Sequence, residues 1–119
     1  MRRPDTALLL ASLLGGSGVL HLLRPRTYEW LVPPELGAAR GWVLGTGVAE
    51  VGVATLLAVP SGRRPGGWLA AVLLAGFVPA HLHTFRVVPR RPSWLGIAAA
   101  RLVLQLPLIR AALRTARGG

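Results

Sequence analysis

Four apolar runs, each about as long as a bilayer is thick, constrain the fold of this chain more than any other feature. They lie at residues 6–23, 41–59, 66–85 and 94–113. A helix of about 20 apolar residues crosses the hydrocarbon core of a membrane. Lipid offers no hydrogen-bond partners to a backbone, so each run is expected to be a helix rather than a strand. The sequence therefore predicts an all-α fold, an integral membrane four-helix transmembrane bundle, in a single transmembrane domain over residues 1–119.

The composition fits a membrane protein better than a soluble one. Hydrophobic residues make up 52% of the chain and charged residues 15%, which excludes disorder and argues against an ordinary soluble domain. The net charge of +10 comes from arginine alone, since the chain has no lysine. Most arginines lie in or beside the short segments between the apolar runs, where a membrane protein meets lipid headgroups. The lipid bilayer is therefore the expected partner, and nucleic-acid binding is not expected.

Several features bear on localisation. Arginine without lysine, together with abundant Ala, Gly, Val and Leu, is typical of bacteria with GC-rich genomes, so we expect a multi-pass protein of the plasma (inner) membrane. The first run follows Arg2 and Arg3 but lacks a small-x-small cleavage pattern, so it is interpreted as a retained span. Tryptophans favour the interfaces, and Trp30, Trp42 and Trp94 are expected at one of them, with Trp68 at the other. The arginine distribution favours cytoplasmic termini, by a small margin.

Glycines and prolines predict how the helices pack. Small residues recur on one face of two runs, which lets helices approach closely. They are Ala11, Gly15 and Gly18 in the first run, and Gly41, Gly45, Ala49 and Gly52 in the second. Proline inside a helix removes a hydrogen bond, so kinks are expected at Pro79 and Pro107.

Glu50 carries the only charge between residues 41 and 59. A carboxylate at the centre of a bilayer costs roughly 2.5–3.5 kcal/mol on insertion scales, so it is expected to face the protein interior and to find a partner. Arg101 lies inside the fourth run, at a similar depth from its leading tryptophan. The sequence therefore predicts a buried Glu50–Arg101 ion pair.

Other polar residues are expected around this pair. His21 and His81 end their runs near the same interface, and Gln105 lies four residues after Arg101, on the same helix face. Ser17 and His21 share a face for the same reason. His83 lies about 200° around the helix from His81, so it is expected to point toward headgroups or a neighbouring helix instead. The predicted polar centre is thus formed by His21, Glu50, His81, Arg101 and Gln105.

The chemistry of this centre stays open at this point. It could fix helix register as a structural ion pair, form a pocket for a quinone headgroup or another small polar ligand, or pass protons. Two histidines on different spans could ligate haem b, but no supporting motif accompanies them. Glu50, His21 and His81 have suitable types for a metal but no recognisable spacing. No catalytic arrangement is found, and the absence of cysteine excludes thiol chemistry.

Short motifs along nearly the whole chain resemble the DoxX-like family of small four-span bacterial membrane proteins. They lie at residues 18–21 (GVLH), 32–34 (VPP), 47–50 (GVAE), 64–70 (RPGGWLA), 78–81 (VPAH) and 101–105 (RLVLQ). Two positions depart from that pattern, since asparagine is usual at His81 and proline at Val103. The resemblance implies four membrane helices and a link to respiratory or redox modules, including membrane subunits of thiosulfate:quinone oxidoreductases.

These observations lead to one functional prediction and two alternatives. The favoured reading is a non-catalytic membrane subunit or small-molecule-binding protein. Its candidate ligand is a quinone. Its candidate partners are redox proteins and further copies of the same chain. No cofactor is firmly implied, haem b is disfavoured, and no metal site is expected. The alternatives are a structural or partner-anchoring protein, in which the polar residues only set helix packing, and a small transporter or proton-conducting unit.

Overall fold

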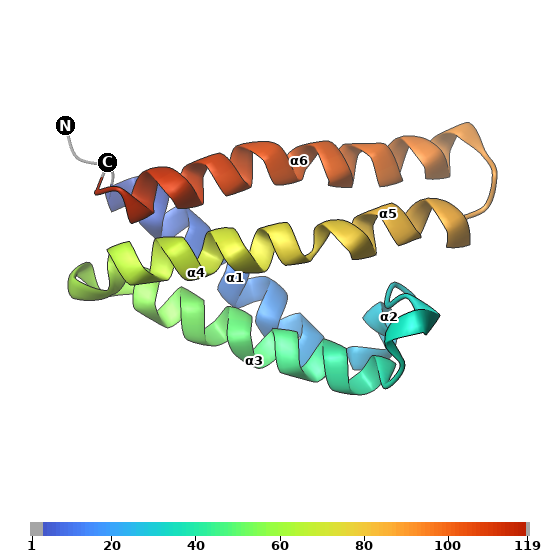
Figure 1. Cartoon of the computed structure of the whole chain (residues 1–119), viewed down its shortest axis with the longest axis horizontal. Coiled ribbons are helices and arrows are strands. Elements are labelled where there is room, and N and C mark those ends of the chain that lie inside the picture. The colour runs from blue at the N-terminus through green and yellow to red at the C-terminus, as the bar shows by residue number, and fades with distance from the viewer. Residues whose placement is uncertain (1–3, 119) are drawn as a thin grey trace.

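The computed structural model describes residues 4–118, which are almost entirely helical (Figure 1). In chain order the elements are α1 (Pro4–Leu23), α2 (Pro25–Glu29), η1 (Pro34–Leu36), α3 (Ala39–Ala58), η2 (Pro60–Gly62), α4 (Arg63–Gly76), α5 (Val78–Val87) and α6 (Pro92–Ala116). Four segments are long and apolar enough to cross a membrane: Thr6–Leu23, Ala39–Ala58, Pro60–Val87 and Pro92–Ala116. The predicted all-α, four-span architecture is confirmed.

The four spans form two antiparallel hairpins that pack on each other. The first hairpin is α1 with α3, and the second is α4–α5 with α6 (Figure 1). α3 and α6 run in the same direction, as expected for the second and fourth spans. The hairpins meet mainly through α3 with α4 and α1 with α6, whereas α5 packs chiefly on α6. The α5 end of the second hairpin therefore separates from α3, and the short elements α2 and η1 lie at that end (Figure 1).

The two prolines inside spans behave differently. The third span breaks into α4 and α5 at Phe77, two residues before Pro79. The Phe77 amide bonds to the carbonyls of both Leu73 and Leu74, which tightens the last turn of α4. The predicted kink at Pro79 thus corresponds to a real break. The kink expected at Pro107 does not interrupt α6, which continues as one helix through that residue to Ala116.

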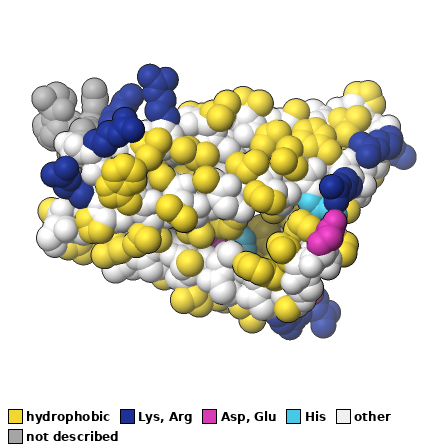
Figure 2. Space-filling model, in the orientation of Figure 1, with side chains coloured by type: hydrophobic (Ala, Val, Ile, Leu, Met, Phe, Trp, Pro, Cys, Tyr) yellow, Lys and Arg dark blue, Asp and Glu magenta, His cyan; other side chains and the backbone are white. Residues whose placement is uncertain are grey.

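Apolar and polar side chains occupy different ends of the bundle interior. The apolar cluster consists of Leu10, Leu14, Val53, Ala54, Leu57, Ala70, Ala71, Leu74 and Ala112. It lies where the N-terminal half of α1 meets α4 and the C-terminal halves of α3 and α6. Among the described residues, most buried polar side chains lie toward the α2 end instead, whereas Thr115 lies at the other end. The face shown in Figure 2 carries many hydrophobic side chains along its length, with arginines at both ends, as expected for a protein surrounded by lipid.

Close helix approach depends on three glycines. A methyl group at Gly18 would lie 2.7 Å from the carbonyl oxygen of Gly47, and one at Gly47 would lie 2.8 Å from Cβ of His21. The backbones of α1 and α3 therefore touch at this crossing. A methyl group at Gly67 would lie 2.5 Å from the backbone nitrogen of Ala116, so α4 and α6 are equally close.

The small-residue stripe predicted on the second span is not the packing face. Positions Gly45 and Gly52 have nothing within 4 Å of an added methyl group, and Ala49 is exposed. Gly47, which lies on the other side of the helix, makes the contact with α1. Helical spacing identified several small residues correctly, but it could not tell which face of α3 meets α1. The burial of Glu50 determines which face of α3 is turned inward. Gly47 lies one turn before Glu50 on the same side of the helix, so it faces α1.

Candidate functional site

Glu50 lies in the interior of the first hairpin and is only 1% exposed. Its Oε1 accepts a hydrogen bond from the Ser17 hydroxyl at 3.3 Å and lies 3.2 Å from Nδ1 of His21. Ser17 and His21 are one turn apart on α1, so both reach the same oxygen. The Gly18–Gly47 contact makes this geometry available, since it brings the α1 backbone against the turn of α3 that carries Glu50.

The hydrogen-bond partners of His21 fix which ring nitrogen carries the proton. Nδ1 lies 2.6 Å from the backbone carbonyl oxygen of Ser17 as well as 3.2 Å from Glu50 Oε1. Both oxygens are acceptors, so Nδ1 is the N–H donor and is shared between them. Nε2 is thereby left available for a different partner. Ser17, His21 and Glu50 form a polar triad, and we use that term for these three residues.

Two aromatic rings hold the imidazole of the triad. The Tyr28 ring stacks on His21 with a centroid distance of 4.1 Å and an interplanar angle of 8°. The Phe77 ring is also nearly parallel to the His21 ring, with a longer centroid distance of 6.4 Å and an interplanar angle of 13°. Tyr28 comes from α2, and Phe77 comes from the break between α4 and α5. The ring of His21 therefore links the first hairpin to the second.

The prediction that Glu50 pairs with Arg101 was wrong. Glu50 Oε1 contacts Nδ1 of His21, and Arg101 makes no ion pair with residues 4–118. The reason is geometric, because α3 packs against α1 and α4, whereas the part of α6 that carries Arg101 packs against α5. Equal depth in the membrane did not make the two charges neighbours.

Arg101 belongs to a second polar group, on α5 and α6. His81 and Gln105 are buried, and His81 Nδ1 and Gln105 Oε1 have no hydrogen-bond partner in the described part of the chain. Buried polar atoms are nearly always satisfied in folded proteins, by protein, water or ligand. The described chain therefore leaves one buried nitrogen on α5 and one buried oxygen on α6 without a hydrogen-bond partner.

A hollow opens between the two hairpins. Figure 2 shows it on the face between α5 and α3, near α2, with acidic and histidine side chains visible at its bottom. It follows from the separation of α5 from the first hairpin.

The residues do not gather as a metal site. Residues 4–118 contain no group of three or more His, Cys, Asp or Glu side chains that could hold an ion. His21 and His81 lie on α1 and α5, and the faces of the His21 ring are occupied by Tyr28 and Phe77.

The sequence identified some of these residues and missed others. The shared face of Ser17 and His21 was visible from their spacing, and the buried Glu50 was visible from its charge. Tyr28 and Phe77 were missed as ring partners because their contacts cross between elements, and no spacing rule encodes such a contact. His83 was expected to point toward headgroups or a neighbouring helix, and its side chain is buried.

Comparison with known proteins assigns the chain to a family without an assigned activity. Residues 10–116 match the model of a domain of unknown function, DUF8561. The chain belongs to this family. Neither a curated protein nor a solved structure matches it. The family match extends over most of the four spans, and its description does not mention DoxX-like proteins, so membership of DUF8561 supports no particular reaction.

Because Glu50 contacts His21 and not Arg101, we expect little energetic coupling between Glu50 and Arg101. The substitutions Glu50→Leu and Arg101→Leu are expected to have additive effects on the free energy of unfolding, with a coupling below about 0.5 kcal/mol, because the two residues share no partner. Unfolding of both single variants and the double variant in mixed micelles measures this coupling. A coupling of several times that size would restore the ion pair inferred from sequence.

Proposed function

We propose that this DUF8561 protein is a non-catalytic membrane protein that binds a small molecule with a flat polar head and an apolar tail, with a quinone as the leading candidate. The head would enter the hollow between α3 and α5, and the tail would extend into lipid. The observation that carries the proposal is the buried Glu50 carboxylate beside the imidazole of His21, which stacks on Tyr28.

The polar atoms of the region suit such a head. Both protein contacts of Glu50 fall on Oε1, and Oε2 makes no hydrogen bond to residues 4–118. Nε2 of His21 is similarly left for a partner. On the opposite side, Arg101 and the side-chain amide of Gln105 can donate to a carbonyl oxygen. These donors and acceptors come from both hairpins, and His21, Glu50, His81, Arg101 and Gln105 are the proposed contacts.

The aromatic residues suit the flat part of the head. Rings prefer offset-stacked or edge-to-face contacts with other rings, and such contacts add about 0.5–1.5 kcal/mol beyond the area buried. Phe77 lies 6.4 Å from His21, a looser spacing than the 4.1 Å of Tyr28. A gap of 6.4 Å does not admit another ring between Phe77 and His21, so a bound ring would contact this group of rings from outside it.

The test is retention of quinone by the purified protein. Protein extracted in mild detergent is expected to carry quinone, detected by organic extraction and mass spectrometry. Glu50→Gln keeps the size of the side chain and is expected to lower retention severalfold. Glu29→Gln is the matched control, because Glu29 pairs with Arg40 on the exposed surface and should leave retention unchanged. Wild-type protein that carries no quinone and takes up none when a short-chain quinone is added would overturn the proposal.

A structural role is the alternative, and one observation favours it. All protein contacts of the Glu50 carboxylate are with α1, at the Gly18–Gly47 crossing, so the triad would also serve to fix the register of the first hairpin. Under this reading Glu50→Gln lowers the melting temperature but has no effect on any bound molecule. Measuring melting and retention on the same samples separates the two functions.

The wider setting is also proposed rather than shown. We place the protein in the bacterial plasma membrane with both termini in the cytoplasm, in keeping with the arginine-rich segments. The DoxX-like motifs support an association with redox partner proteins, and a homo-oligomer is compatible with a small four-span protein.

A further inference from the structure

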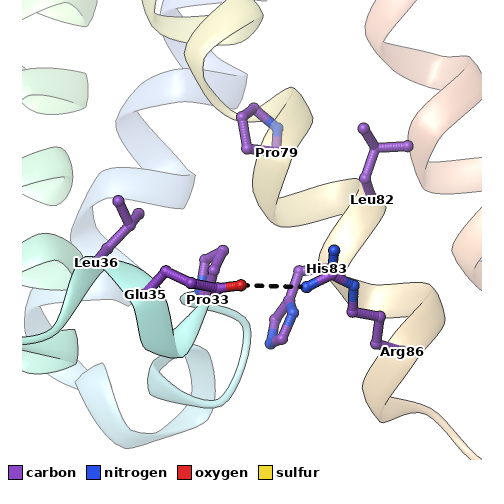
Figure 3. Close-up of a pocket in the computed structure, with 7 residues that line it drawn as sticks. All are labelled: Pro33, Glu35, Leu36, Pro79, Leu82, His83 and Arg86. Carbon is purple, nitrogen blue, oxygen red and sulfur yellow. Dashed lines mark ion pairs between the residues drawn. The ribbon is translucent and has the colours of Figure 1, made fainter.

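A second cavity lies outside the hollow and shares none of the triad residues. It has a volume of about 350 Å³ and is lined by Pro33, Glu35, Leu36, Pro79, Leu82, His83 and Arg86. Figure 3 shows it between the η1 segment and α5, with the Arg86–Glu35 ion pair across its rim. Its volume is within the usual range for small-molecule pockets.

His83 is the reason to regard this cavity as a binding site. The residue is only 7% exposed, and its Nδ1 has no hydrogen-bond partner within the described chain. Leaving a buried polar group unsatisfied destabilises a protein, so such a group usually has a partner supplied from outside the chain. The ring extends from α5 toward the loop that carries Pro33 and Glu35 (Figure 3). It can turn about Cβ–Cγ to offer a nitrogen to a group in the cavity.

The ion pair at the rim is weak and exchangeable. Arg86 Nη1 lies 3.6 Å from Glu35 Oε2, and the two side chains are 68% and 70% exposed. Ion pairs this exposed contribute little to stability. A phosphate that accepts two hydrogen bonds from the guanidinium forms a stronger contact. Glu35 therefore occupies the position that an anionic group can take.

The rest of the cavity wall is apolar and open to lipid. Pro79, Leu82 and Leu36 are exposed on the lateral surface of the bundle, where they would contact acyl chains. A ligand that fits all three features has a negative phosphate, a hydrogen-bonding oxygen a few atoms away, and a hydrocarbon tail.

We propose that this cavity binds one anionic phospholipid of the surrounding bilayer. Arg86 holds the phosphate in place of Glu35, His83 contacts a glycerol or ester oxygen, and one acyl chain lies along Pro79 and Leu82. The lipid connects η1 to α5 and so stabilises the end of the bundle at which the hairpins separate.

Native mass spectrometry of the full chain in detergent tests this site. Phosphatidylglycerol is expected to bind as one tightly held molecule, in preference to phosphatidylcholine at equal concentration. Arg86→Gln is expected to weaken phosphatidylglycerol binding by about three- to tenfold. Arg90→Gln is the matched control, because Arg90 is an exposed arginine near the same helix end that does not line the cavity. Glu35→Gln is expected to strengthen binding, because it removes the competing carboxylate.

Three outcomes would overturn the proposal. Equal losses from Arg86→Gln and Arg90→Gln would mean only general attraction of anionic lipid to a basic protein. Weaker binding by Glu35→Gln would show that this carboxylate supports the site rather than competes for it. Displacement of the lipid by millimolar inorganic phosphate would assign the site to free phosphate instead. The variant His83→Leu is expected to reduce lipid binding without lowering the melting temperature. If this variant does not fold, the Arg86 and Glu35 variants still test whether the cavity binds the lipid.

Discussion

Replacing Gly18 with alanine is expected to destabilise the protein by about 2–3 kcal/mol, because a methyl group there would lie 2.7 Å from the Gly47 carbonyl oxygen. The obstacle is backbone, so no side-chain rotation relieves the clash, and α1 must move away from α3. Such a movement lengthens the contacts that Ser17 and His21 make with Glu50. SDS titration in mixed micelles, followed by circular dichroism, measures the loss.

Gly16 supplies the matched control on the same helix. It lies two residues away from Gly18, is exposed, and has nothing within 4 Å of an added methyl group. Gly16→Ala is therefore expected to change stability by less than about 1 kcal/mol, in the stabilising direction if at all. The two substitutions have the same chemistry and differ only in what the new methyl group meets. Equal effects would show that the α1–α3 contact is not as close as described.

The four spans could be predicted because lipid restricts the choices available to a chain. An apolar run of bilayer length has to be a helix, so the fold class followed from the hydropathy pattern alone. Glu50 was equally visible, since one charge in such a run must face inward. The break near Pro79 followed from the missing backbone amide. Each of these inferences depends on a single segment and needs no knowledge of its neighbours.

The partner of Glu50 could not be predicted in the same way. Depth along the membrane normal placed Arg101 and His21 within reach equally well, and charge favoured Arg101. The choice depends on which face of α3 packs against α1, and the small-residue stripe that includes Gly45 and Gly52 pointed to a different face from that of Gly47. Burial of Glu50 and the backbone contact with Gly18 select α1 together. The burial of His83 could not be predicted for a related reason, because His83 faces the η1 segment across a shared cavity and the position of η1 cannot be derived from periodicity.

Replacing His21 with leucine is expected to destabilise the protein by about 3 kcal/mol, within the range measured when a buried charged group loses its partner. Glu50 would keep only the 3.3 Å hydrogen bond from Ser17, in an interior that water barely reaches. Leucine keeps Cβ in place against Gly47, so the close crossing itself is retained. The measurement is again unfolding in mixed micelles.

The double variant His21→Leu/Glu50→Leu shows whether the cost comes from the stranded carboxylate or from lost stacking on Tyr28. The stack is lost in the single variant and in the double variant alike, so it cancels in the double-mutant cycle, and the coupling energy reports the polar contact. We expect the double variant to recover most of the stability, because apolar residues can replace a buried pair at little cost. The coupling should be about 2–3 kcal/mol, against the near-zero value expected for Glu50 with Arg101. The Glu50–His21 and Glu50–Arg101 cycles thus compare the two candidate partners of Glu50 directly. A larger coupling to Arg101 than to His21 would contradict the placement of the Glu50 contacts within the first hairpin.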